Sequence, residues 1–107
     1  MSEYMIVYIT TPNMKRARKI AKLLVEEKLA ACVNLIKGME SLYEWKGKLR
    51  QEEEVLMLVK TRQKLFATLQ EKVLSIHSYD VPCIVGFPLT EGNESYLNWL
   101  KEQTSDA

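Results

Sequence analysis

The sequence predicts an α+β domain in which two amphipathic helices cover one face of a four-stranded antiparallel sheet. The chain contains two unbroken apolar runs, 5–9 and 55–59, which are typical of central strands buried on both faces. Two further stretches, 17–25 and 65–76, repeat apolar residues at helical spacing. With 107 residues, 47% of them apolar, the chain has room for one hydrophobic core. We therefore expect a single domain spanning residues 1–107.

Local signals place the ends of the first strand and of both helices. Pro12 ends the first apolar run, and Asn13 is a predicted N-cap for the helix that follows. The second helix is expected to begin near Arg62 and to end near Ile76. The only histidine of the chain, His77, lies at that end.

A long β-hairpin is predicted between the two helices. Its first arm, residues 30–45, is followed by a Lys-Gly-Lys turn signal. This arm would span roughly 50 Å at about 3.3 Å per residue, whereas a domain of this size has a radius of gyration near about 13 Å. Either the arm bends at a bulge at Gly38, or its tip protrudes and buries Leu42, Tyr43 and Trp45 against another copy of the chain.

The fourth strand is predicted at 81–88, and its prolines and glycine confine it to a sheet edge. The hairpin's first arm contains Gly38 and is the other edge, so the strand order is 4-1-3-2, that of the ferredoxin-like βαββαβ fold. Right-handed crossovers place both helices on one face. The other face is then partly apolar and calls for a partner. A short helix near 96–100 ends the fold, and residues 103–107 are expected to be disordered.

Composition narrows the class of partner. Fifteen basic and fourteen acidic side chains give a net charge of +1, so no overall field draws the protein to nucleic acid or to anionic lipid. The third strand is acidic and lacks the aromatic residues with which RNA-recognition modules stack bases. The apolar run 5–9 is far too short to span a membrane. Two cysteines distant in sequence favour a reducing, cytoplasmic compartment.

The sequence contains no catalytic motif, and we expect a protein that is not an enzyme. The run Glu52-Glu53-Glu54 is interpreted as a solvated charge run rather than as a catalytic pair. His77, Asp80 and Cys83 are candidate ligands for a divalent transition metal, in the spacing H-x-x-D-x-x-C. The structural alternative has His77 capping its helix as a cation and Cys83 as a small buried apolar residue. Cys32 lies on the opposite edge strand, too far away for a disulfide with Cys83.

Six short motifs, in order along nearly the whole chain, resemble the CutA family of divalent-cation tolerance proteins. They are Thr11-Pro12, Leu29 to Asn34, Ser41 to Lys48, Glu54 with Lys60-Thr61, His77 to Pro82, and Tyr96 to Trp99. The resemblance implies a cytoplasmic homotrimer whose architecture is similar to that of the nitrogen-regulatory PII proteins, with hairpins that wrap neighbouring subunits. It implies a role in tolerance of copper and other divalent metals. It also implies a cleft between subunits formed by Tyr43, Trp45, Lys60, His77 and Tyr79.

This sequence departs from the family pattern around His77. Ser78 and Asp80 replace the proline and glutamate that members usually have, and Cys83 stands where glutamate is common. The copper ligands proposed in some members fall at Ile9, Ile76 and His77, so only the histidine is retained. The leading hypothesis is a protein that binds divalent cations, copper above all, through His77 with Asp80 and Cys83. The alternative is a PII-like scaffold that senses a small molecule or docks a partner without metal.

Overall fold

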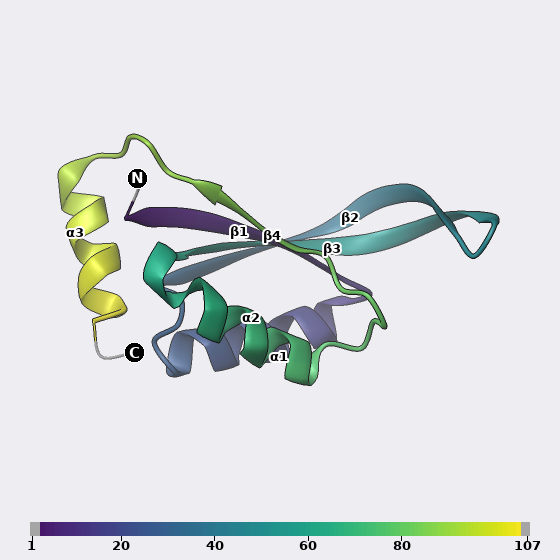
Figure 1. Ribbon diagram of the computed structural model, residues 1–107, viewed down its shortest axis with the longest axis horizontal. Coiled ribbons are helices and arrows are strands. Elements are labelled where there is room, and N and C mark those ends of the chain that lie inside the picture. The colour runs from purple at the N-terminus through teal and green to yellow at the C-terminus, as the bar shows by residue number, and fades with distance from the viewer. Residues whose placement is uncertain (1–2, 106–107) are drawn as a thin grey trace.

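The sheet has the predicted topology. A computed structural model describes residues 3–105. Its strands are Tyr4–Thr11 (β1), Cys32–Trp45 (β2), Lys48–Arg62 (β3) and Ile84–Pro88 (β4), all paired antiparallel in the order β2-β3-β1-β4 (Figure 1). This confirms the 4-1-3-2 order and the two edge strands.

The helices form a layer and an end piece. They are Met14–Glu26 (α1), Phe66–Ile76 (α2), which follows a 3₁₀ turn at Gln63–Leu65 (η1), and Glu94–Gln103 (α3). α1 and α2 lie on the same side of the sheet, and α3 stands at the end of the sheet away from the hairpin tip (Figure 1). The predicted N-cap is confirmed, because the Arg16 backbone N–H donates to Asn13 Oδ1 at 2.8 Å. None of the helices within residues 3–105 is long and apolar enough to cross a membrane.

The hydrophobic core lies between the sheet and the α1–α2 layer. Val7 pairs with Val59 and Ile9 with Met57, and all four side chains are fully buried. From the helix layer, fully buried residues pack onto them, namely Ile20, Leu24, Leu69 and Val73. Each such aliphatic side chain stabilises the fold by roughly 1.5–3 kcal/mol relative to exposure. The helix-covered face therefore supplies the main stability of one subunit.

The opposite face of the sheet is apolar, and most of it is open within one subunit. Alternate residues of the four strands form cross-strand neighbours on it, namely Ile6, Tyr8, Ile36, Leu56, Leu58, Val85 and Phe87. Phe87 is 52% exposed and lies edge-on to Tyr8, with ring centroids 6.4 Å apart. α3 contacts only one end of this face, at Lys60 and Arg62. Burial of β1 and β3 on both faces stays a prediction, because it depends on a partner that one subunit does not contain.

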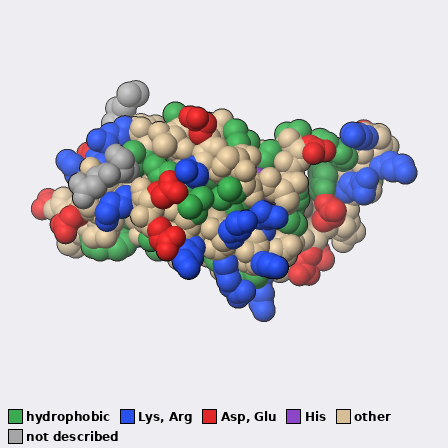
Figure 2. All heavy atoms as spheres, turned by 90° about the horizontal axis from the view of Figure 1, so that it is seen from below, with side chains coloured by type: hydrophobic (Ala, Val, Ile, Leu, Met, Phe, Trp, Pro, Cys, Tyr) green, Lys and Arg blue, Asp and Glu red, His purple; other side chains and the backbone are tan. Residues whose placement is uncertain are grey.

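The hairpin both bulges and protrudes. The β2–β3 register shifts between Ile36 and Met39, where Gly38 has a φ of +84°. Beyond this bulge the two strands extend past the helix layer, and the chain measures 45 × 25 × 22 Å (Figure 1). Lys46 and Gly47 both have positive φ, as a tight two-residue hairpin turn requires. Lys and Arg side chains gather at this end (Figure 2), while Leu42 is 62% exposed.

The chain after α3 is ordered as far as the structure describes it. Gln103 is the last residue of α3, and Thr104 is fully buried. Ser105 donates its side-chain hydroxyl to the Lys101 carbonyl. The expected disorder of residues 103–107 is thus wrong for 103–105, because Thr104 is bound by polar partners. Residues 106 and 107 lie outside the described residues.

Candidate ligand-binding cleft

A cleft of about 470 Å³ lies at the base of the hairpin extension, where β1 ends and the α2–β4 loop passes. This volume falls within the range of small-molecule sites, about 300–1,000 Å³. The lining side chains come from those three segments, and they are Thr10, Tyr43, Trp45, Arg50, Glu52, Glu54, Ser78, Tyr79, Asp80, Val81 and Cys83. The cleft therefore combines aromatic rings with carboxylates.

Glu54 is the buried polar group of the cleft, with 8% of its surface exposed. The Tyr79 hydroxyl donates to Glu54 Oε2 at 2.6 Å. Burial, together with this hydrogen bond, raises the pKa of Tyr79 far above its usual value. The interpretation of residues 52–54 as a solvated charge run is wrong for Glu54, because strand alternation turns it toward the cleft while Glu53 remains exposed on the other side.

Tyr43 and Glu52 form a second tyrosine–carboxylate pair at the mouth of the cleft. The Tyr43 hydroxyl donates to Glu52 Oε1, and this hydrogen bond raises the pKa of Tyr43. Arg50, the single cation among the lining residues, is the cross-strand partner of Tyr43. Both tyrosine hydroxyls thus point their protons at carboxylates.

His77 supports the cleft from behind and does not line it. Its Nδ1 accepts the Tyr79 backbone N–H at 3.1 Å, so Nε2 bears the ring proton and donates to the Thr10 carbonyl at 2.7 Å. The His77 and Tyr79 rings lie 4.8 Å apart. His77 is the C-cap residue of α2, as the structural alternative predicts, because its backbone N–H donates to the Val73 carbonyl. Its ring does not bind the helix end, since both ring nitrogens are engaged by Thr10 and Tyr79.

The three predicted metal ligands are not brought together in one subunit. Asp80 and Cys83 line the cleft, but both ring nitrogens of His77 are engaged elsewhere. Among residues 3–105, no three His, Cys, Asp or Glu side chains are placed to hold a metal ion. Burial, and then the negative charge of Glu54, raises the pKa of the Cys83 thiol. The donor groups within the described part of a single chain therefore do not fit a resident metal.

Lys60 lies away from the cleft within the subunit. Its ammonium group sits over the Tyr96 ring of α3, 5.5 Å from the ring centroid. Lys60 lies six positions along β3 from Glu54, or roughly 20 Å at about 3.3 Å per residue. Of the five residues predicted around a cleft between subunits, Tyr43, Trp45 and Tyr79 line the cleft of one chain. The cleft between subunits stays a prediction. The two cysteines are free, as the sequence distance predicts.

Sequence reasoning missed the polar lining residues Thr10, Arg50, Glu52 and Glu54. A signal for three of them is present in the hairpin. Counting outward from the two-residue turn pairs Tyr43 with Arg50, and alternation then puts Glu52 and Glu54 on the same face. The sequence carries no local signal that brings Thr10 to this place.

The fold and the cleft together define a ferredoxin-like α+β protein with a protruding hairpin and an acidic, aromatic-lined cleft at its base. The profile of the CutA1 divalent ion tolerance protein family matches residues 5–103, and the chain belongs to that family.

Individual relatives agree in sequence and structure. The divalent-cation tolerance protein CutA of Thermus thermophilus is 50% identical over 99 residues, covering 92% of this chain and 96% of its own. The chloroplastic protein CutA of Arabidopsis thaliana is 48% identical over 92% of this chain, which spans only 54% of that relative's length. The structure of CutA1 from Oryza sativa superimposes with a TM-score of 0.95 at 42% identity, covering 99% of this chain and 97% of the other.

Proposed function

We propose that this protein serves divalent-cation tolerance as a non-enzymatic, cytoplasmic homotrimer that binds divalent cations, copper(II) above all, at the boundary between subunits. Membership of the CutA1 family supports the role in tolerance. The trimer and the cation site are steps beyond that membership, and each has its own support and its own test.

The single observation that carries the homotrimer is the uncovered apolar face of the sheet. Cross-strand neighbours such as Tyr8, Leu58 and Val85 form a continuous apolar surface there, and monomeric proteins rarely expose one. The protruding hairpin adds Leu42 and Leu49, which are 62% and 76% exposed. Both surfaces would be buried if copies of the chain packed sheet face to sheet face and covered each other's hairpins.

Light scattering at micromolar concentration tests the assembly. We expect a mass three times 12.4 kDa for the unmodified chain. Phe87→Asp, on the open face, should lower that mass, because an unpaired charge would be buried at the interface. Leu74→Asp is the matched control, since Leu74 is 48% exposed on α2, on the helix-covered side. A 12.4 kDa particle for the unmodified chain would exclude the trimer.

The cation site is proposed between subunits because residues 3–105 of one chain do not assemble three ligands. Asp80 and Cys83 are this chain's contribution, since both line the cleft. His77 would join them only by giving up its bonds to Thr10 and Tyr79. A carboxylate with a thiolate or imidazole suits a divalent transition metal.

Titration with copper(II) by calorimetry and electron paramagnetic resonance tests this site. We expect weak binding by the assembled protein, weakened further by Asp80→Asn or Cys83→Ser. Glu53→Gln should leave it unchanged, because Glu53 is exposed and does not line the cleft. The proposed site is contradicted if the unmodified chain does not bind copper(II). It is also contradicted if Asp80→Asn and Cys83→Ser bind as well as the unmodified chain does.

The cleft itself favours a second candidate function, the sensing of a small molecule by a PII-like scaffold without metal. Its volume of about 470 Å³ exceeds what a bare ion needs. A co-purifying small molecule that dissociates from the native protein in mass spectrometry would support this candidate. A native mass equal to that of the unliganded chain or oligomer would count against it.

Two features of the structure support the absence of catalysis and the cytoplasmic location. The pKa of the Cys83 thiol is raised, the reverse of what a nucleophile needs, and the one imidazole is engaged by backbone groups. Both cysteines are free, which suits a reducing compartment. Cell fractionation tests the location. A reproducible turnover lost on mutating Lys60 or His77 would establish an enzyme instead.

A further inference from the structure

The lining of the cleft has more negative than positive side chains among the residues that the structure describes. Three lining carboxylates, Glu52, Glu54 and Asp80, stand against one guanidinium, that of Arg50. None of the ion pairs among residues 3–105 involves any of these four side chains. The cleft is therefore electrostatically complementary to a positively charged ligand.

Glu54 is the carboxylate of the cleft that a positively charged ligand would contact. It is 8% exposed, and the Tyr79 hydroxyl satisfies one oxygen, Oε2, without neutralising the charge. The tyrosine hydroxyl is a neutral donor, and none of the ion pairs within residues 3–105 involves Glu54. A cation that enters the cleft and reaches Glu54 would supply the charged partner that a carboxylate favours.

The aromatic lining distinguishes an organic cation from a metal ion. Tyr43, Trp45 and Tyr79 present ring surface beside the carboxylates, and Val81 adds an apolar side chain. Ring faces attract ammonium groups and cover attached hydrocarbon. Burial of Tyr79 and the Tyr43–Glu52 hydrogen bond keep both phenols protonated, so neither adds a phenolate ligand for a metal. Aromatic rings beside carboxylates are the lining that suits an organic cation. Within residues 3–105 no three ligands are placed to hold a metal ion.

We propose that the cleft binds a small aliphatic ammonium ion, with a diamine fitting best, whose charged ends meet Glu54 and Glu52 or Asp80 while its methylene groups lie against Tyr43, Trp45 and Tyr79. The inference rests on the second candidate function and names the class of molecule that is sensed. A diamine matches the net negative charge of the lining better than a monoamine does. A lysine or arginine side chain of a neighbouring copy is also positively charged and would compete with the diamine for the cleft.

Calorimetric titration with 1,4-diaminobutane, using the assembled protein, tests the proposal. The ligand control is 1,4-butanediol, which has the same chain length and no charge. The fluorescence of Trp45, in a Trp99→Phe background, reports occupancy of the cleft itself. We expect the diamine to bind and to change this fluorescence, and its affinity to fall with added salt. The diol should do neither.

Two neighbouring glutamates provide matched variants. Glu54→Gln should weaken diamine binding about tenfold or more, because a charge-assisted hydrogen bond is lost. Glu53→Gln removes the same charge from the adjacent, exposed position and should leave the affinity unchanged. If Glu54→Gln does not assemble, Glu52→Gln and Asp80→Asn, both at exposed positions of the lining, carry the same comparison.

Three results would overturn the proposal. They are no binding of the diamine, equal affinity for diamine and diol, and equal binding by the unmodified chain and the carboxylate variants. A neighbour's lysine or arginine seated on Glu54 in a structure of the assembly would overturn it too. The copper(II) titration and the light-scattering mass are read separately, so loss of this inference leaves cation tolerance and the trimer standing.

Discussion

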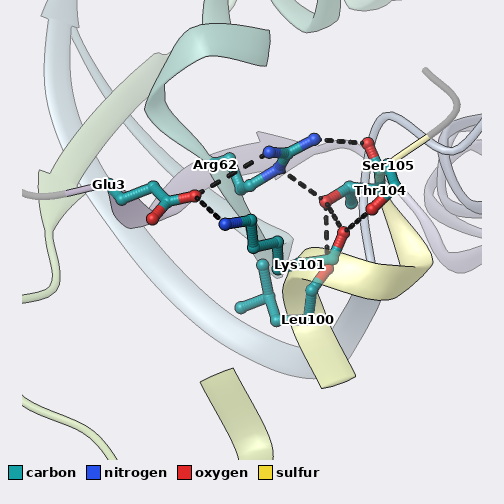
Figure 3. Close-up of polar contacts among 6 residues, drawn as sticks. All are labelled: Glu3, Arg62, Leu100, Lys101, Thr104 and Ser105. Atoms are coloured by element: carbon teal, nitrogen blue, oxygen red, sulfur yellow. Dashed lines mark hydrogen bonds and ion pairs between the residues drawn. The ribbon is translucent and has the colours of Figure 1, made fainter. Parts of the chain in front are cut away.

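The guanidinium of Arg62, at the end of β3, binds Thr104 at the end of α3 through two hydrogen bonds (Figure 3). Arg62 Nε donates to Thr104 Oγ1 at 2.9 Å, and Nη2 donates to the Thr104 carbonyl at 2.7 Å. The Arg62 side chain is 5% exposed, and Glu3 Oε2 lies 3.8 Å from its Nη1. Because a helix C-terminus favours a cation, the buried charge is stabilised by the end of α3. This contact attaches α3 to the sheet.

Replacing Thr104 should detach α3. In Thr104→Val the Nε of Arg62 loses its acceptor inside the protein, and we expect the free energy of unfolding to fall by about 1–3 kcal/mol. Urea unfolding measures the loss, and hydrogen exchange should show it concentrated in α3. Ser105→Ala is the control, because Ser105 is exposed and its side-chain hydroxyl donates to the Lys101 carbonyl and not to Arg62. Equal stability of the two variants would show that the Arg62 contact contributes nothing.

The hydrogen bonds of His77 predict its tautomer. Since Nδ1 accepts the Tyr79 N–H and Nε2 faces the Thr10 carbonyl, nitrogen NMR at neutral pH should show the proton on Nε2. His77→Leu leaves both backbone partners unsatisfied and should cost about 1–3 kcal/mol of stability. A proton found on Nδ1 would contradict this account of the α2–β4 loop.

The raised pKa of Cys83 predicts slow alkylation. Burial and the charge of Glu54 keep the thiol protonated at neutral pH, and the thiolate is the reactive form. In a Cys32→Ser background, iodoacetamide should label Cys83 appreciably only at a pH above the usual thiol range, near about 8.5. Glu54→Gln should increase the rate, since it removes one of the two causes. A rate equal to that of an unhindered model thiol would refute the raised pKa.

Stability should fall in alkaline solution through Tyr79. Its folded pKa is raised, so the folded protein binds this proton more tightly than the unfolded chain does. By linkage, the free energy of unfolding decreases as pH rises above the unfolded tyrosine value of about 10. Denaturant unfolding across that range measures the slope. Tyr79→Phe, which has no phenolic proton, should show a smaller slope, and an unchanged slope would assign the effect to other groups.

The places where sequence reasoning succeeded are governed by local patterns. The apolar runs at 5–9 and 55–59 identified the central strands, and the glycine and prolines identified the edges. Asn13 is the N-cap its position predicts. Apolar periodicity and turn residues depend only on neighbouring positions, so the sequence alone predicts them.

Sequence reasoning was less complete for side chains whose surroundings come from distant segments. Glu54 looked solvated, but the α2–β4 loop covers it with Tyr79. Lys60 stays a predicted residue of the cleft between subunits, and within one chain α3 brings Tyr96 against it. His77 is the C-cap that its position predicts, but the partner of its ring, the Thr10 carbonyl, comes from the end of β1. In each case the deciding partner lies more than twenty residues away in the sequence.

The sequence by itself determined the order of the strands and the length of the hairpin, because apolar periodicity and turn residues act over a few positions. The family was indicated by the resemblance of six short motifs to it. Only the tertiary structure decided which faces of those elements are buried. It decided that most of the sheet's second face stays apolar and open in one subunit, and that Arg62 binds the end of α3. It also decided that Tyr79 covers Glu54, which takes part in none of the ion pairs within residues 3–105. Burial and charge pairing arise from contacts between segments distant in sequence, and no local pattern records them.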